Sequence, residues 1–266
     1  MHIIVCVKQT PSSDNVKVDP STGCLIRDGV ESAMNPFDEF AVEEAVRLKE
    51  RLSGSIVTAV TMGPPQAENV IREAIARGCD TGIHICDKAL AGSDTWATSY
   101  TLSMAVKKLS EKQPAGLVIC GKQTNDSDTG HVGPGIAAWL DWPCTAFVRK
   151  VEEISETLIR VERLMEDGYD VLEMPVPAVL SVIKEINEPR VASLKGRLAA
   201  KRAAILRFSC TDLGCDPAII GGSGSPTSVV KCFAPGRRTG GMRIEGADPR
   251  EKAAKLISIL REGKFI

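Results

Sequence analysis

The sequence predicts an α/β protein with a doubly wound, mostly parallel sheet that carries an antiparallel extension. Two observations support this fold class. Short apolar runs alternate with amphipathic, helix-like segments from the first residue to about residue 142, and such alternation is typical of parallel sheets covered by helices. The chain also has 43% hydrophobic and 25% charged residues, which is enough apolar material for a sizeable core.

The first half of the chain contains four strand signals, each followed by a helix signal. HIIVCVK, at residues 2–8, is the first strand, and the next helix begins with Asn35 as N-cap and Pro36 at its first position. The second helix ends at Gly78, which accepts the left-handed conformation of a helix end. The other predicted elements are strands at 55–62, 82–86 and 117–120 and helices at 66–77, 94–112 and from 128–130 through 139.

The pattern changes after Trp142. Three further strand-like runs, at 144–154, 157–166 and 170–183, predict antiparallel members that extend the sheet. From Asn187 the chain is polar and rich in Gly and Pro. We therefore expect an α/β domain of residues 1–190, then an arm of residues 191–266 that lies along a partner or the parent domain. The arm ends in a helix with Asp248 as cap and Pro249 at its first position.

The stretch LVICGKQTNDSDTGHVGP, at residues 117–134, is the most informative segment. It reads as a buried strand, a polar turn and a helix start, and ligands bind parallel sheets at such places. Gly121 and Gly130 permit close backbone approach, while Asp126 and Asp128 can cap a helix or accept hydroxyl hydrogen bonds. An ordinary strand–turn–helix connection explains the spacing equally well, and the spacing does not name a ligand.

Composition excludes several classes of protein. The net charge of −1, without a basic block interleaved with aromatics, argues against nucleic-acid binding. No apolar run approaches the ~20 residues that span a bilayer, so an integral membrane protein is not expected. Nine scattered cysteines without a CxxC pair, in a chain that opens MHIIVCVKQT, indicate reduced thiols, no metal site and a cytoplasmic location.

Seven segments occur in a familiar order: VCVKQTP, NPFDEFAVEEAVRLKE, TMGPPQAE, AGSDTWATSYTL, CGKQTNDSDTGHVGP, EINEPRVASLKG and GSPTSVVKCFAP. Together they resemble the beta subunit of electron-transferring flavoproteins, from Met1 to about Arg238. The resemblance implies a heterodimer whose alpha subunit is wrapped by the C-terminal arm. The complex would shuttle electrons between flavoenzymes, without a catalytic triad of its own.

Two types of family member differ in their ligand. Conventional members hold a structural AMP in the beta subunit and accept electrons from acyl-CoA dehydrogenases. Electron-bifurcating members hold FAD there and oxidise NADH at it. They divide the electron pair between a low-potential carrier, such as ferredoxin or flavodoxin, and a high-potential acceptor, such as an acyl-CoA dehydrogenase or related flavoenzyme.

The family's nucleotide site, carried over position by position, falls on strand ends and helix starts. Its cofactor-binding residues would be Cys6, Lys8, Asn35, Asp38, Met62, Asp94, Thr95, Thr98, Gly121, Gln123, Asp126, Asp128, Thr129, Gly130, His131 and Val132. These positions agree with the ligand edge expected from the strand pattern. No catalytic residue and no metal ligand is implied.

Several of these positions favour FAD over AMP. Val132 stands where conventional members have a phosphate-binding Thr, and residues 128–134 and 91–100 are similar to bifurcating members. His131, in place of the usual Gln, is atypical. NPFDEFAVEEAVRLKE and LDWP are similar to conventional members and are expected to reflect core packing.

Some residues have a plainer interpretation beside the functional one. Asp94 is either a simple helix cap or part of a helix start near a pyrophosphate, and Lys8 is either a solvated charge or a phosphate contact. His131 is either a partly exposed residue with ordinary hydrogen bonds or a donor to the ligand. The three tryptophans, Trp96, Trp139 and Trp142, are expected to be core or interface anchors.

The resemblance also places a partner-recognition loop at residues 188–197, where Leu194 stands alone among polar and small neighbours. An isolated exposed Leu is common, but an apolar anchor can dominate a small interface. A third class, a nucleotide-activating enzyme of the adenine-hydrolase type, would need a Gly/Ser loop after the first strand. Lys8-Gln9-Thr10-Pro11 stands there instead.

Overall fold

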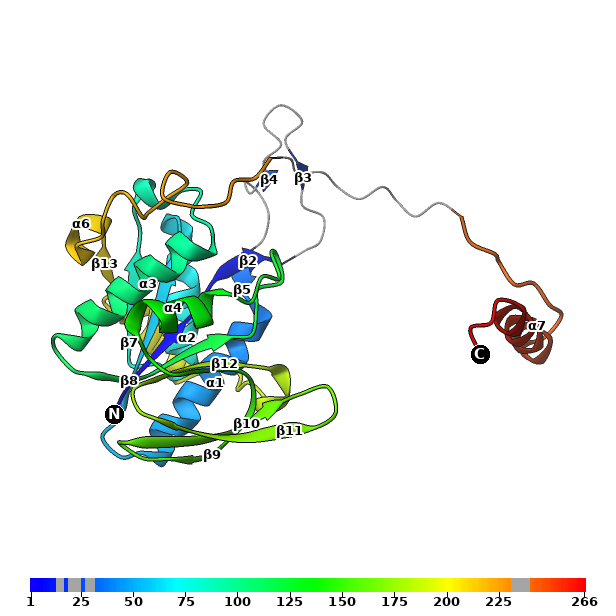
Figure 1. Ribbon diagram of the computed structural model, residues 1–266, viewed down its shortest axis with the longest axis horizontal. Coiled ribbons are helices and arrows are strands. Elements are labelled where there is room, and N and C mark those ends of the chain that lie inside the picture. Colours follow the sequence, from blue (N-terminus) through cyan, green and yellow to red (C-terminus); the bar gives the residue numbers. More distant parts are fainter. Residues whose placement is uncertain (13–16, 19–24, 27–31, 231–239) are drawn as a thin grey trace. The chain divides into compact units, whose positions relative to one another are not determined.

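The computed structural model describes residues 1–12, 17–18, 25–26, 32–230 and 240–266, and it divides into two units, Met1–Lys231 and Cys232–Ile266. The first unit contains a nine-stranded sheet with the strand order β11-β10-β9-β12-β8-β1-β6-β7-β13, and helices cover it (Figure 1). The strands are β1 (His2–Cys6), β6 (Ile56–Met62), β7 (Thr81–Ile85), β8 (Ala115–Gly121), β9 (Cys144–Ile154), β10 (Leu158–Leu164), β11 (Tyr169–Pro175), β12 (Ala178–Val182) and β13 (Leu206–Phe208). Two small antiparallel pairs join β2 (Gln9–Pro11) to β5 (Ser32–Met34) and β3 (Lys17–Val18) to β4 (Leu25–Ile26).

The mostly parallel sheet with an antiparallel extension is confirmed, but one part of the extension was predicted wrongly. The run at 170–183 divides at Val176-Pro177 into β11 and β12. Strand β12 lies between β8 and β9 and is parallel to both, while β10 is antiparallel to β9 and β11. All five residues of β12, AVLSV, are buried, as expected for a central parallel strand that is covered on both faces.

The helices follow the predicted order. They are α1 (Pro36–Arg51), α2 (Glu68–Arg77), α3 (Thr95–Ser110), α4 (Val132–Leu140), α5 (Leu194–Arg202), α6 (Cys210–Leu213) and α7 (Pro249–Glu262). Asp94 and Asp248 cap α3 and α7 through their side chains, and Gly78 ends α2 with φ +126°. The predicted start of α4 at 128–130 is wrong, because Asp128 and Gly130 have left-handed backbones (φ +52° and +67°) that a right-handed helix cannot include.

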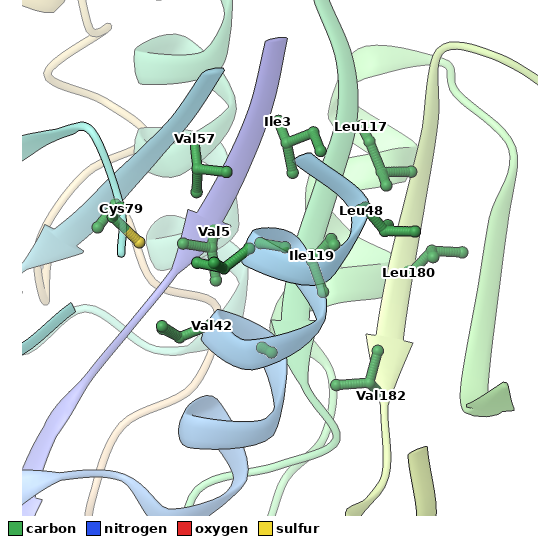
Figure 2. Close-up of a cluster of buried hydrophobic side chains, with 14 of the residues drawn as sticks. Ile3, Val5, Val42, Leu48, Val57, Cys79, Leu117, Ile119, Leu180 and Val182 are labelled. Carbon is green, nitrogen blue, oxygen red and sulfur yellow. The ribbon is translucent and has the colours of Figure 1, made fainter. Parts of the chain in front are cut away.

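Helices α1 and α2 cover one face of the sheet, and α3 and α4 cover the other, each over its own apolar core. Figure 2 shows the first core, in which Val42 and Leu48 of α1 lie over Val5 of β1 and Ile119 of β8. The residues of this core alternate along β1 (Ile3, Val5) and β8 (Leu117, Ile119), and those of α1 recur at helical spacing. The packing of α1 on the sheet therefore follows from the periodicity of the sequence.

Part of the predicted arm belongs to the first unit. Helix α5 packs beside α2, where Arg72 NH1 donates to the Ala200 carbonyl oxygen at 2.7 Å. Strand β13 then pairs with β7 in parallel at the sheet edge. Residues 191–230 therefore lie along the parent domain. The unit Cys232–Ile266 contains α7, which exposes Leu256 and Ile257; that it wraps a partner subunit remains a prediction.

Gly121, at the end of β8, permits the closest approach of this strand to α1. A Cβ at Gly121 would lie 2.5 Å from Asp38 Oδ1 and 2.7 Å from the Phe37 carbonyl carbon. We predict that Gly121→Ala destabilises the protein by about 1–3 kcal/mol, because backbone atoms must shift. Thermal unfolding measures the loss. Gly133→Ala is the matched control, since its nearest neighbour would be 3.5 Å away; equal melting temperatures for the two variants would contradict the prediction.

Candidate functional site

The sheet changes its winding direction between β1 and β8. The chain runs outward from β1 through β6 to β7, and α3 then returns it to β8 on the opposite side of β1. Open α/β sheets bind ligands at the carboxyl ends of the strands at such a switch point. We call this region the switch edge; it comprises residues 6–10, 35–38 and 121–133.

Two side-chain contacts join the loops of the switch edge. Lys8 Nζ lies 2.8 Å from both carboxylate oxygens of Asp126. The buried side chain of Asn35 donates to the Gln123 carbonyl oxygen at 2.9 Å and accepts from Asn125 N at 3.2 Å. Asn35 does hold the N-cap position of α1, but its side chain does not cap the helix. It bridges to the loop after β8, which sequence spacing could not show.

Asp38 lies buried in the first turn of α1, directly under the ends of β1 and β8. Its Oδ2 accepts a hydrogen bond from Lys8 N at 2.7 Å, and the Asn35 side chain and the Gly121 backbone also favour its ionised form. Burial raises its pKa to about 7, against the opposing effect of these polar neighbours. Asp38 is therefore a buried hydrogen-bond acceptor whose carboxyl group gains or loses its proton near neutral pH.

The loop after β8 leads into a helix start that has no side-chain cap. Gln123 Nε2 donates to Asp128 Oδ1 at 2.8 Å, and the exposed His131 at the N-cap position makes no capping hydrogen bond. Within the described part of the chain, the N–H groups of Val132 and Gly133 have no acceptor. Asp126 and Asp128 do not cap α4, because Asp126 pairs with Lys8. This free helix start is suited to an anion.

The start of α3 is capped by the side chain of Asp94. Asp94 accepts from Trp96 N and Ala97 N at 2.9 and 3.1 Å and from Thr227 N and Oγ1 at 3.1 and 2.8 Å, while Asp94 N donates to Ser225 Oγ. Burial opposes ionisation of Asp94, but these hydrogen bonds outweigh it and lower the pKa. Asp94 is thus a helix cap that also binds the GSPT segment, residues 224–227, through Ser225 and Thr227.

Helices α3 and α4 start at the same edge of the sheet and pack closely. A Cβ at Gly135 would lie 2.6 Å from Ser99 Oγ, and the Trp96 and Trp139 rings are 4.6 Å apart. Trp96 is 48% exposed beside a hollow of about 540 Å³, lined also by residues 223–226. Two helix N-termini therefore lie at this side of the edge, and the one without a side-chain cap, that of α4, fits a ligand with phosphate groups.

Of the remaining predicted residues, Cys6 belongs to the switch edge, whereas Met62, Thr95 and Thr98 lie on other elements. Cys6 ends β1 beside Cys120 of β8; their side-chain hydrogen bond and burial raise the pKa of Cys120, so this thiol stays protonated. Met62 ends β6, one strand beyond β1. Thr95 and Thr98 lie in the first turns of α3.

The structure thus brings one predicted group together and separates another. Cys6, Lys8, Asn35, Asp38, Gly121, Gln123, Asp126, Asp128, Thr129, Gly130, His131 and Val132 belong to the switch edge. Leu194 lies apart, at the start of α5. Ser225 and Thr227 were not predicted as site residues; the GSPT motif was their only sequence signal.

Two absences concern the described residues alone. They contain no cluster of three or more His, Cys, Asp or Glu residues that could hold a metal ion. Within the same part of the chain, no helix has both the length and the apolar character needed to cross a bilayer.

Fold and switch edge define a doubly wound α/β protein with a free helix start at its topological switch point. Residues 22–213 match the electron transfer flavoprotein domain. The chain is 41% identical over its full length and that of the caffeyl-CoA reductase-Etf complex subunit CarD of Acetobacterium woodii. It is 44% identical, again over both full lengths, to the electron transfer flavoprotein subunit beta of Thermoanaerobacterium thermosaccharolyticum. Protein FixA of Azotobacter vinelandii is 41% identical over 97% of this chain and 88% of its own. The chain belongs to the electron transfer flavoprotein family.

The buried Asp38 predicts a pH dependence of stability. Its pKa is about 7 in the folded protein and ordinarily 3.8, so between these values the folded state keeps a proton that the unfolded state has lost. The free energy of unfolding should therefore fall as the pH rises from about 4 to 7, by at most about 1.4 kcal/mol per pH unit from this group. Asp38→Asn should reduce this slope in urea unfolding between pH 5 and 7.

Asp126→Asn is the control for this experiment. Its carboxyl group has a lowered pKa, because hydrogen bonding to Lys8 outweighs the effect of burial, and its contribution to stability is lost only at more acidic pH. The slope between pH 5 and 7 should thus be that of the wild type. An unchanged slope in Asp38→Asn would show that Asp38 is ionised throughout this range.

Proposed function

We propose that this chain, paired with an alpha subunit, holds FAD at the switch edge, accepts electrons from NADH there and passes them to partner flavoenzymes. The observation that carries the proposal is the pair of helix starts, α3 and α4, on one side of this edge. One of them has free N–H groups at Val132 and Gly133. A dinucleotide has a pyrophosphate that such groups can bind.

The residues of the switch edge would divide the work of binding. Backbone N–H groups from Gly130 to Gly133 would donate hydrogen bonds to phosphate oxygens. The left-handed conformation of Gly130 (φ +67°) lets the backbone turn toward these oxygens. The Lys8 side chain, 42% exposed, can exchange Asp126 for a phosphate. Val132 offers no hydroxyl, so phosphate binding at this position would rest on the backbone.

The bound flavin would supply a two-electron acceptor for hydride from NADH. Such transfer needs the reacting atoms roughly 3–3.5 Å apart, which requires an open face on the sheet edge. Trp96 and residues 223–226 line an open hollow beside α3, and the exposed His131 stands at the start of α4. We propose His131 as a donor to a phosphate or flavin oxygen.

A conventional beta subunit with a structural AMP is the second candidate. NPFDEFAVEEAVRLKE favours it by resemblance, but this segment forms α1, whose Val42 and Leu48 are core residues (Figure 2). Its similarity is accounted for by packing, whatever the ligand. The segment at 91–100 forms the start of α3 at the ligand edge, and its resemblance to bifurcating members therefore bears more directly on the ligand.

Partner flavoenzymes would dock at Leu194. This side chain is 76% exposed, as the recognition-loop hypothesis requires, although residues 194–197 form the first turn of α5 and not a loop. The A. woodii relative is named as a subunit of a caffeyl-CoA reductase-Etf complex, which supports an enzyme acting on CoA esters as partner, such as an acyl-CoA dehydrogenase. Ferredoxin or flavodoxin would be the low-potential acceptor.

A cytoplasmic location completes the proposal. Seven cysteines lie in the described residues, and all are free thiols. Free thiols are the usual state in a reducing compartment.

The ligand proposal predicts two flavins in each heterodimer and their reduction by NADH. Acid release should yield FAD in a 2:1 ratio to the heterodimer and no AMP, and anaerobic NADH should bleach flavin absorbance. Both can be measured by chromatography and rapid-mixing spectroscopy. One flavin and one AMP, with no bleaching by NADH, would establish the conventional alternative.

The docking proposal predicts that Leu194→Ala slows electron exchange with an acyl-CoA dehydrogenase roughly tenfold at limiting partner concentration, since a buried anchor can dominate a small interface. Flavin content and reduction by NADH should not change. Leu198→Ala is the matched control, one turn further along α5 and also exposed. Equal rates for the wild type and both variants would exclude Leu194 from docking.

A further inference from the structure

The segment before Leu194 has almost no regular structure, yet α1 holds it at several points. Asn187 Nδ2 donates to the Phe40 carbonyl oxygen at 3.1 Å and to Glu44 Oε2 at 3.0 Å. The carbonyl oxygen of Glu188 accepts from Arg47 NH2 at 3.3 Å. The segment is therefore fixed to a helix that is itself part of the core.

Glu43 makes the strongest of these connections. Its side chain is 3% exposed, and its carboxylate accepts from Arg190 N, Nε and NH2 at 3.0, 2.7 and 3.2 Å and from Arg47 Nε at 2.6 Å. Burial opposes ionisation of Glu43, but the hydrogen bonds from Arg190 and Arg47 outweigh it, and the pKa lies below its usual value. The ionised carboxylate of Glu43 thus accepts hydrogen bonds from both the backbone and the side chain of Arg190.

Arg190 has a second partner in a different environment. Its NH1 and NH2 lie 2.7 and 3.1 Å from the carboxylate of Glu50, which is itself exposed. Exposed ion pairs contribute little, whereas the loss of one partner of a buried pair is costly. The buried contact with Glu43 should therefore dominate, which makes Glu50 a built-in control.

Polar contacts, more than apolar packing, hold this segment. A cavity of about 400 Å³ lies between it and helices α1 and α2, lined by Glu39, Arg77, Val191 and Arg197 among others. Downstream, Ser193 caps α5 by accepting from Gly196 N at 3.0 Å. The hydrogen bonds between Arg190 and Glu43 therefore hold the middle of the segment, between Asn187 and the Ser193 cap.

The consequence is a pair of apolar side chains presented on a fixed backbone. Val191 is 85% exposed and Leu194 is 76% exposed, three residues apart on either side of the Ser193 cap. Ordering a loop at the moment of association reduces affinity, and a loop that is already ordered avoids this loss. Docking strength should thus depend on residues that never touch the partner.

We propose that Glu43 is a positioning residue for partner docking: through Arg190 it fixes the segment 187–193 so that Val191 joins Leu194 in one apolar contact with an apolar pocket on the partner flavoenzyme. This proposal rests on the docking role of Leu194 proposed above. It assigns to a buried carboxylate on α1 an effect on a surface interaction.

The test uses the complete heterodimer with Glu43→Gln, Glu50→Gln and Leu194→Ala, and an acyl-CoA dehydrogenase with which the wild type exchanges electrons. Glu43→Gln should slow exchange roughly 5- to 20-fold at limiting partner, with the rate at saturating partner, reduction by NADH and transfer to a small dye unchanged. Amide hydrogens of residues 187–193 should exchange with solvent faster. Glu50→Gln should change the rate less than about twofold.

Arg190→Lys provides a second variant if Glu43→Gln folds poorly, because it keeps the charge but loses the two-pronged contact; it should also slow exchange with the partner. Wild-type rates and wild-type amide exchange in Glu43→Gln and Arg190→Lys, with Leu194→Ala still slow, would overturn the positioning role and leave the docking role intact. A wild-type rate in Leu194→Ala would overturn both.

Discussion

The arrangement of the switch edge depends on one buried carboxyl group, Asp38. Strands β1 and β8 stop pairing at their carboxyl ends, and backbone N–H groups that leave a sheet inside a protein need new acceptors. Asp38 accepts from Lys8 N at 2.7 Å at this point and lies close to Gly121 at the end of β8. The loop after β1 can therefore leave the sheet without leaving its buried donor unpaired, and the divergence of the two loops creates the switch edge. The cost is a carboxyl group so desolvated that its pKa is raised to about 7.

Helix α1 carries this constraint to the rest of the molecule. Its first turn supplies Asp38, and the preceding Asn35 bridges to the loop after β8. Its apolar face forms part of the core in Figure 2, and two of its carboxylates, the buried Glu43 and the exposed Glu50, bind Arg190. One helix of 16 residues therefore supports the switch edge, the core and the segment before Leu194. A change in its position would alter both the switch edge and this segment.

The sequence was sufficient where local rules decide the structure, and insufficient where the partner of a side chain is distant. Helix starts at Pro36, Asp94 and Pro249 were predicted because capping chemistry is local. The insertion of β12 between β8 and β9 was missed, because an apolar run gives no information on its neighbours in a sheet. Asn35 illustrates the same limit: its type predicts a cap, but a loop nearly ninety positions further along the chain competes for the side chain and wins.

The site shows a similar division. Strand order places the residues after β1 and β8 together, so the group from Lys8 to Val132 was predictable from the pattern and the resemblance. The hydrogen bonds that join Asp94 to Ser225 and Thr227, one from Asp94 N to Ser225 Oγ and one from Thr227 Oγ1 to the Asp94 carboxylate, were not, since a Gly/Ser/Pro run has no periodicity that assigns it to an element. The arm was expected to lie along a partner or the parent domain, and its first part does lie along the domain. That α5 packs beside α2 and that β13 pairs with β7 was not predicted, because these segments are too short to give a pattern.

The polar contacts of the switch edge differ in how readily they can be exchanged. Asn35 and Asp38 are buried, and removing their partners would leave desolvated polar groups, which costs about 1–3 kcal/mol each. The pair Lys8–Asp126 is different, because Lys8 is 42% exposed and an exposed ion pair contributes at most about 1 kcal/mol. The phosphate of the proposed ligand would therefore take Lys8 from Asp126 at little cost while Asn35 and Asp38 keep the loops in place. The edge combines a fixed frame with one exchangeable charge, and on the proposed function this would allow the ligand to bind without a rearrangement of the fold.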